Sequence, residues 1–331
     1  MMPSRSTLEP TPAITGLVNL FATHSLVALG EVHGSQDEAD FITALLHHPA
    51  FPAAVQFIVI EFGNALYQPV MDRFIAGETI AARDLRPVWR DFFGWGFDAP
   101  IYEQFFRTVR AINRTLPLAQ RLRVLLGDPP FDWSQITQAV DLNSMMEKRD
   151  LYYASLVETH ILAPGYHGLL IAGLGHFIRE WAAPDAPDVH NTVQRLERNH
   201  PGSVHIIFPH IGFGAETSAL EPYLAGWPIP SLVSLRSTWL GELDAALHFG
   251  NFQPPGVEPP PLKQGFTLGH MADSYLYLGP RSSLTRSTYN PAIYRGDELL
   301  HSELQRRHSL VAPPGYVLDL LTEGDPRLFP D

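Results

Sequence analysis

Residues 29–46, LGEVHGSQDEADFITALL, join the end of one apolar run to the start of an amphipathic pattern. The run before the first glycine has the length of a β-strand, and the apolar residues after it recur at helical spacing. Ser35 and Glu38 have the spacing of a capping box, which marks the start of a helix over 36–48. The stretch therefore predicts a strand, a short polar loop and a helix.

The same alternation continues along the chain. Strand-length apolar runs occur at 25–29, 56–60, 122–126, 168–172, 203–208, 231–235 and 274–278. Helical patterns lie between most of them, at 36–48, 64–76, 99–115 and 143–162. Nearly continuous apolar runs are typical of strands that are covered on both faces. We therefore expect an α/β fold with a central, largely parallel sheet and helices on both faces.

The gap between the second and third runs is longer than a single crossover needs. We interpret residues 62–120 as a helical insertion or cap, with an aromatic cluster that either packs it onto the core or forms an apolar wall. Residues 251–264, NFQPPGVEPPPLKQ, are rich in proline and are expected to form an extended connection. We expect residues 1–331 to form a single α/β domain.

Composition limits the classes of partner. The net charge is 23 − 35 = −12, which disfavours nucleic acid and anionic membranes as partners. No apolar run reaches the length of a membrane span, and the N-terminus lacks the apolar block of a secretory signal. There are no cysteines, so disulfides and thiolate metal sites are excluded. We expect a cytoplasmic protein that acts on a small-molecule substrate; the oligomeric state is not predicted.

Five consecutive predicted strands are followed by a carboxylate or a histidine. Ligands bind beyond the carboxyl ends of strands in such sheets, so these side chains are expected to face one mouth. The residues are Glu31 and His33, Glu61, Asp128, His176, and His210. Each has a structural interpretation when taken alone: the first pair could close a turn, and Asp128 could form a turn with the prolines that follow it. Their convergence favours a functional site.

The chemistry of this set is that of acid–base or metal catalysis. A carboxylate that holds a histidine makes a general base. Glu31, His33 and His176 could also hold a divalent metal that polarises a carbonyl group and activates water. Both interpretations stay open at this stage.

Arg149 lies on the same predicted helix face as Tyr153, which is expected to contact the core. A charged side chain on such a face is normally paired. Its partner could be Asp150 on the same helix, Glu31 or Glu61 across the mouth, or an oxygen of the substrate.

The order of these motifs resembles the erythromycin-esterase / ChaN-like / TraB–Tiki superfamily over roughly residues 25–180. GEVHG follows the first strand, an acid follows the second, an Arg-Asp pair lies on a helix, and AGLGH follows a later strand. The resemblance implies an α/β core with two GxxH-type motifs and acidic residues around one mouth. The positions that match are Glu31, His33, Glu61, Arg149, Asp150 and His176.

From the site and the resemblance together we expect a hydrolase that cleaves an ester or amide bond, metal assistance being open. His33 would be the general base, oriented by Glu31 or Glu61. His176 would be a second base, an acid or a metal ligand, and Arg149 would hold a carboxylate or stabilise the oxyanion. Asp128, Asp150 and His210 are secondary candidates.

Two alternatives accompany this hypothesis. The esterase branch has one more residue between Glu and His than GEVH has, which favours the ChaN-like and Tiki-like branches. The ChaN-like branch is associated with haem, so a haem- or metal-binding module without hydrolytic activity is the first alternative. Histidines and the tyrosines Tyr152 and Tyr153 could then supply axial ligands. The chain lacks that branch's lipoprotein signal and lipobox cysteine, which makes a divalent metal the better cofactor candidate. The second alternative is a degenerate scaffold that keeps the mouth without the chemistry.

Overall fold

The structure is a computed structural model of the full chain. It describes residues 8–91, 98–179, 191–210, 220–245, 265–288 and 290–311, together with Asp319 and Leu321. The Pro-rich connection predicted at 251–264 lies outside the described residues, as do the aromatic residues at 92–97. No helix in the described ranges is long and apolar enough to cross a membrane.

The described residues form one eight-stranded sheet with the order β1-β7-β8-β6-β2-β5-β3-β4. The strands are β1 (Thr11–Pro12), β2 (Leu26–Glu31), β3 (Phe57–Asn64), β4 (Arg123–Asp128), β5 (Gly168–Gly173), β6 (Val204–Pro209), β7 (Ser231–Ser234) and β8 (Ser274–Tyr277). The six strands from β8 to β4 run parallel, and β7 and β1 are antiparallel additions at one edge. The carboxyl ends of β6, β2, β5, β3 and β4 therefore lie side by side.

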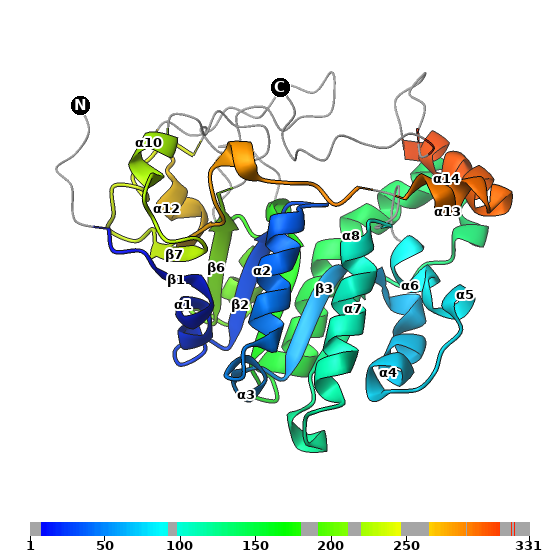
Figure 1. Cartoon of the computed structure of the whole chain (residues 1–331), viewed down its shortest axis with the longest axis horizontal. Helices are drawn as coiled ribbons and strands as arrows, with labels where there is room; N and C mark the ends of the chain where they lie inside the picture. Colours follow the sequence, from blue (N-terminus) through cyan, green and yellow to red (C-terminus); the bar gives the residue numbers. More distant parts are fainter. Residues whose placement is uncertain are drawn as a thin grey trace.

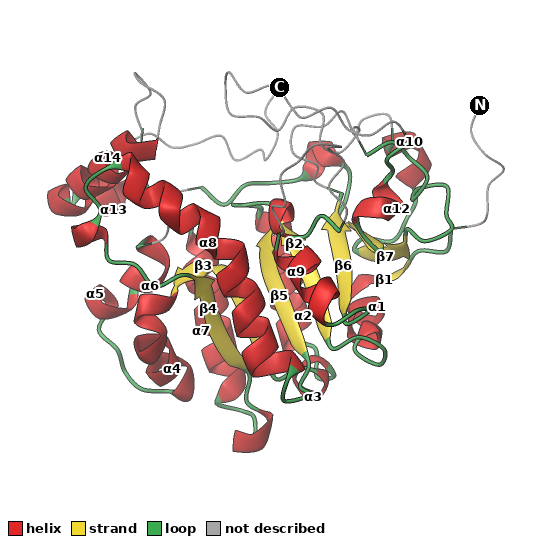
Figure 2. Cartoon of the chain, turned by 180° about the vertical axis from the view of Figure 1, so that it is seen from behind, coloured by secondary structure: helices red, strands yellow, loops and turns green. Residues whose placement is uncertain are grey.

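Helices cover both faces of this sheet, as Figures 1 and 2 show from opposite sides. The helices are α1 (Ala13–Leu20), α2 (Gln36–His47), α3 (Phe51–Ala54), α4 (Gln68–Ala76), α5 (Ala82–Leu85), α6 (Pro87–Arg90), α7 (Pro100–Asn113), α8 (Ala139–Val157), α9 (Thr192–Asn199), α10 (Glu221–Leu224), α12 (Leu268–Met271), α13 (Pro291–Arg295) and α14 (Glu298–Val311). One face carries α1, α2, α4 and α7, and the other carries α8 and α9.

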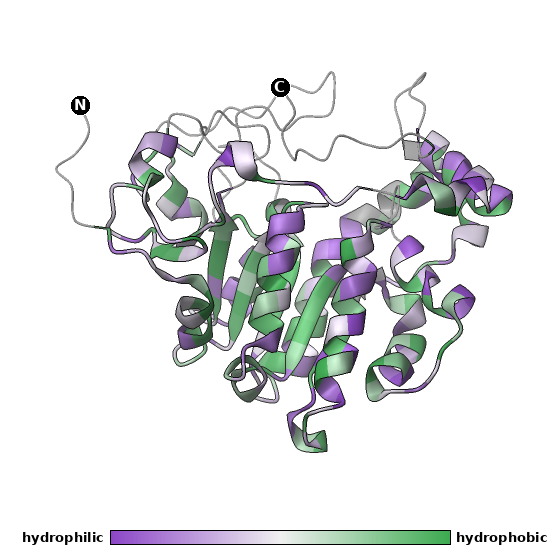
Figure 3. Ribbon diagram, viewed as in Figure 1, coloured by the Kyte–Doolittle hydropathy of each residue, from purple (hydrophilic) through white to green (hydrophobic). Residues whose placement is uncertain are grey.

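Alternation along each strand divides the core between the two faces. In β2, Val27 and Leu29 pack with α1, α2 and α7, whereas Leu26 and Ala28 pack with α8 and α9. Figure 3 shows the central strands as the most hydrophobic part of the molecule. Burial on both faces explains why the apolar runs are continuous rather than alternating.

The predicted fold class is confirmed. Each of the seven predicted strands is present, and only the two-residue β1 was not predicted. Residues 62–120 are largely helical, but α7 packs against α2 and α4, so this insertion covers one face of the sheet. The helix predicted from 143 begins earlier, at Ala139, because the Asp141 carboxylate accepts from the backbone N–H of Gln138 and caps it there.

Candidate active site

The loop after β2 carries Glu31 and His33 and is fixed from α7. Gly34 adopts a φ of 84°, which glycine allows without steric cost, and turns the chain into α2. Its N–H donates to the Tyr102 hydroxyl oxygen at 2.9 Å, and the Tyr102 hydroxyl donates to Glu31 Oε1 at 3.0 Å. One tyrosine therefore sets both the backbone turn and the position of the Glu31 carboxylate.

A segment from much later in the chain fastens the same loop from outside. The N–H of Gln36 donates to the carbonyl of Thr285 at 3.0 Å, and the N–H of Ser287 donates to the carbonyl of Gly34 at 2.8 Å. The Asp37 carboxylate accepts from the N–H of Thr285 at 2.6 Å and from its hydroxyl at 3.0 Å. We call residues 285–287 the strap.

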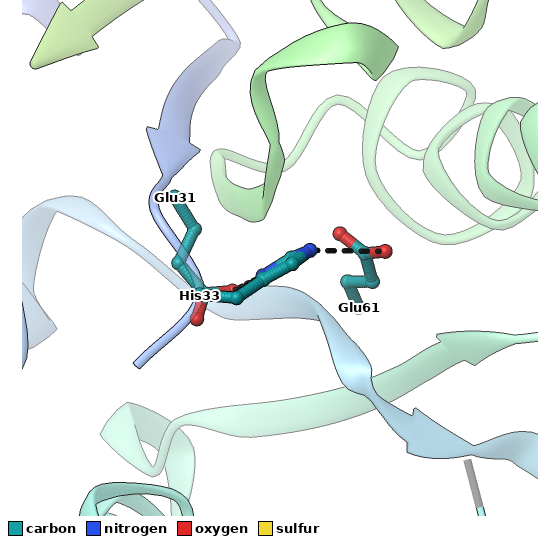
Figure 4. Close-up of side chains that lie close together, drawn as sticks. All are labelled: Glu31, His33 and Glu61. Atoms are coloured by element: carbon teal, nitrogen blue, oxygen red, sulfur yellow. Dashed lines mark ion pairs between the residues drawn. The ribbon is translucent and has the colours of Figure 1, made fainter. Parts of the chain in front are cut away.

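The His33 ring lies between two buried carboxylates, as Figure 4 shows. Nδ1 is 3.4 Å from Glu31 Oε2, and Nε2 is 3.8 Å from Glu61 Oε1. The His33 side chain is 44% exposed, whereas the two carboxylate side chains are 6% and 3% exposed. Desolvation alone would lower the pKa of His33, but the charges of Glu61 and Glu31 outweigh it, so the pKa is raised above its ordinary value.

Glu61 accepts a short hydrogen bond on each of its two carboxylate oxygens. The register of β3 against β4 shifts between Ile60 and Asn64, next to Glu61. Its Oε1 accepts from Arg149 Nη2 at 2.6 Å, and its Oε2 accepts from the N–H of Gly173 at 2.5 Å. Burial would raise the pKa of Glu61, but Arg149 first and then the two histidines hold it well below the usual range. Glu61 is therefore an anion at neutral pH.

Arg149 joins two strand ends. Its Nε donates to Asp128 Oδ1 at 2.7 Å, and Nη2 also donates to the Tyr153 hydroxyl oxygen at 2.9 Å. Arg149 is 5% exposed. The alternatives for its partner are thus resolved: it pairs with Glu61 and Asp128, across the mouth, and not with Asp150.

His176, which ends the short helix Leu174–His176 after β5, has two carboxylate neighbours. Its Nδ1 lies 2.8 Å from Asp150 Oδ1, and its Nε2 lies 3.7 Å from Glu61 Oε1. Asp150 is anchored by the N–H and hydroxyl of Thr192, at 2.7 and 2.6 Å. Burial would lower the pKa of His176, but Asp150 and Glu61 raise it to about 9, so the ring is a cation at neutral pH.

Gly173 makes room for this arrangement. A Cβ atom at this position would lie 3.3 Å from both Glu61 Oε2 and His33 Nε2. The glycine of AGLGH therefore allows β5 to approach both residues closely and to donate its own N–H to Glu61.

The structure brings together most of the residues predicted from the sequence. Glu31, His33, Glu61, Asp128, Arg149, Asp150 and His176 form one connected cluster. His210 does not join it: Nδ1 lies 2.6 Å from the Tyr275 hydroxyl and Nε2 lies 3.0 Å from Glu221 Oε1. The position after β6 thus belongs to a separate buried contact.

Three supporting residues were not predicted as part of the site. Tyr102 and Thr192 anchor Glu31 and Asp150, and the Tyr153 hydroxyl bonds to Arg149. Tyr153 was expected to contact the core or, in the haem alternative, to be an axial ligand, and not to support Arg149. Sequence offers little signal for such contacts, since Tyr102 lies 71 residues from Glu31.

Three members of the cluster could offer ligand atoms to one metal ion. One ligand atom from each of Glu31, His33 and Glu61 lies within 4.8 Å of the others, so Glu61 takes the place that the sequence interpretation gave to His176. However, both Glu61 oxygens already accept short hydrogen bonds, one of them from the Arg149 guanidinium. A divalent cation would have to share this carboxylate with a positive charge, so the set fits a metal poorly.

Among known proteins, only solved structures match this chain. No family model matches the sequence, and no curated protein matches it. Among solved structures, a succinoglycan biosynthesis protein matches with a TM-score of 0.56 at 9% identity, over 82% of this chain and 94% of that one. A Bacillus cereus protein matches with a TM-score of 0.52 at 11% identity, over 82% and 94%.

An erythromycin esterase in an open conformation matches with a TM-score of 0.51 at 12% identity, over 82% of this chain and 97% of that one. The resemblance read from the order of the motifs is therefore confirmed at the level of the fold. The chain has the fold that this erythromycin esterase adopts.

Proposed function

We propose that the protein is a hydrolase that cleaves an ester or amide bond of a small molecule with water, and that His33 is its general base. The observation that carries this proposal is the placement of one half-exposed imidazole between two buried carboxylates. The erythromycin esterase fold is consistent with such chemistry and supports the proposal without identifying a substrate.

The carboxylates prepare His33 for this task. The negative charge of Glu31 favours the tautomer with its proton on Nδ1, in which Nε2 carries no proton and can accept one. A water molecule beside Nε2 and Glu61 Oε1 would donate to both as it attacks the carbonyl carbon. The imidazolium that forms is stabilised by both carboxylates, and its raised pKa reflects that stabilisation.

His176 is suited to the complementary step. It holds a proton at neutral pH, and Asp150 fixes its Nδ1 side. After water has added to the carbonyl group, the bond to the leaving oxygen or nitrogen breaks and the leaving group needs a proton. His176 supplies this proton. The proton that His33 took from water then passes through solvent to His176, which restores both rings for the next turnover. Arg149 acts at a distance by holding Glu61 and Asp128 in place.

Haem ligation is supported less well. Tyr153, one of the tyrosines considered as an axial ligand, is fully buried and bonded to Arg149. Adding haem to the purified protein and recording the Soret band tests this alternative, and we expect no sharp shift.

A panel of chromogenic esters and amides tests the main proposal. We expect at least one to be hydrolysed, with kcat/KM falling by about 10²–10⁴-fold in His33→Ala. His47→Ala is a matched control, because this histidine lies at the far end of α2. Hydrolysis at the parental rate by His33→Ala would remove the assignment. Elemental analysis and EDTA treatment test metal assistance, and we expect no stoichiometric metal and no loss of activity.

A further inference from the structure

Glu31 lines a cavity of about 30 Å³ between α2 and α7. Its polar wall includes Glu31, Ser35, Glu38 and Tyr102, and its apolar wall includes Phe62 and Ile101. The volume suffices for about one or two water molecules. The proposed mechanism does not use this space or Glu38.

Glu38 is an unusual residue to find here, because it is 1% exposed. The sequence predicted that Glu38 belongs to a capping box. Its backbone N–H does donate to Ser35 Oγ at 3.3 Å, as such a box requires. Its side chain instead accepts from the N–H of Val32 through Oε2, at 3.0 Å. The other oxygen, Oε1, is buried and receives no hydrogen bond from the described residues.

Glu31, which lines the same cavity, also has a buried carboxylate oxygen without a hydrogen-bond donor in the described part of the chain. Tyr102 donates to its Oε1, but its Oε2 has no hydrogen-bond donor among the described residues and only the 3.4 Å approach of His33. Two buried carboxylate oxygens without donors are costly, and two carboxylate anions beside one another are more so. Burial and the charge of Glu31 raise the pKa of Glu38 well above its usual range.

We propose that Glu38 is a positioning residue which stays protonated and, with a water molecule held in this cavity, supplies the missing hydrogen bonds to Glu31. The acid proton and the water protons then satisfy Glu38 Oε1 and Glu31 Oε2 together. Glu31 is then held through both oxygens, by Tyr102 at Oε1 and by the water and the acid at Oε2.

A water molecule suits this cavity because it can donate a hydrogen bond to a carboxylate oxygen and accept one from a protonated carboxyl group. One acid and one anion bridged by water need only the protons already present.

NMR titration of His33 tests the proposal without reference to hydrolysis, so its failure is distinct from failure of the proposed function. Glu38→Gln keeps the size and a donor, and Asp40→Asn removes one charge from the exposed side of the same helix. We expect Glu38→Gln to change the pKa of His33 no more than Asp40→Asn does. If Glu38 were an anion, its removal would lower the pKa of His33 clearly further, and that result would overturn the proposal.

A second pair of measurements covers the case in which a variant folds poorly. A high-resolution crystal structure of the parent should show an ordered water within hydrogen-bond distance of both carboxylates, and an empty cavity or a bound cation would contradict this. With a responsive ester, which rests on the proposed function, Glu38→Leu should lower kcat about tenfold and Glu38→Gln should restore most of it. Equal loss in both variants would also contradict the proposal.

Discussion

A partly buried histidine follows β5 and a fully buried one follows β6, and both have polar partners, yet their pKa values are shifted in opposite directions. Two carboxylates flank His176 and raise its pKa to about 9. His210 is fully buried between one carboxylate, Glu221, and the Tyr275 hydroxyl, and its pKa is lowered. At His176 the two carboxylates together raise the pKa more than desolvation lowers it. At His210, with one carboxylate, desolvation has the larger effect and the pKa falls.

This contrast shows which histidine can carry a proton for chemistry at neutral pH. His176 has a proton to give and retains some access to solvent, with 16% of its side chain exposed. His210 is neutral and 0% exposed, so it is suited to linking β6 to β8 and α10. Position after a parallel strand is therefore insufficient to define a functional histidine.

The largest expected difference between His176 and His210 is in catalysis. His176→Ala should lower kcat on a responsive ester by about a hundredfold to a thousandfold, because the leaving group loses its acid. His210→Gln, which can still donate to Glu221, should retain kcat within about twofold. The kinetics are measured under conditions in which circular dichroism shows that both variants are folded. An equal loss of kcat in both would contradict the assignment of His176, and not His210, as the acid.

The next effect concerns stability. Arg149→Met leaves Glu61 and Asp128 as buried anions without their cation, so the free energy of unfolding should fall by about 3–5 kcal/mol in urea denaturation. Arg73→Met is the matched control, since its pair with Glu78 is exposed and should contribute less than about 1 kcal/mol. Similar values for both would mean that the buried network contributes little.

A smaller effect separates the two histidines by pH. Protonated His176 is required in the proposed mechanism, so activity should fall as pH rises through about 9. Asp150→Asn removes a flanking charge and should move this fall to lower pH by about one to two units. Glu221→Gln, the corresponding change beside His210, should leave the alkaline limb of the pH–kcat profile in place. An unmoved limb in Asp150→Asn would assign it to another group.

The smallest effect appears in the pH dependence of unfolding. The folded pKa of His176 is raised, so its contribution to stability is complete below about pH 6.5 and is lost as pH rises through about 9. The folded pKa of His210 is lowered, so its burial costs stability as pH falls below about 6.5. His176→Gln should flatten the alkaline side of the stability curve, and His210→Gln should reduce the acid-side slope. His205, whose pKa is lowered to about 4, keeps the rest of that slope.

Sequence was sufficient for the fold because the physical signal was local. Continuous apolar runs follow from burial on both faces, and each run can be recognised by itself. The two-residue β1 gives no such signal, and its pairing with β7 depends on distant residues. The predicted start of α8 was four residues too late, because the capping contact that starts the helix joins Gln138 to Asp141, before the predicted start at 143.

The meeting of Glu31, His33, Glu61 and His176 could be predicted because the carboxyl ends of parallel strands share one edge. The partner of Arg149 could not, since the sequence interpretation weighed Asp150 equally with the carboxylates across the mouth. The register shift in β3 beside Glu61 was not visible in the sequence. The prediction that His210 belongs to the site was wrong for a related reason: the sequence does not show which way a side chain points after its strand ends.

The strap has a consequence for how the protein matures. Thr285 follows Asp37 by 248 residues, so at about 5–20 residues per second the ribosome needs roughly 10–50 s after making the His33 loop to make its fastening. A nascent chain that stopped short of residue 285 would hold every charged and titratable member of the cluster, but its loop would have the Tyr102 contacts without the strap. Full anchoring of this loop therefore waits for synthesis of the strap.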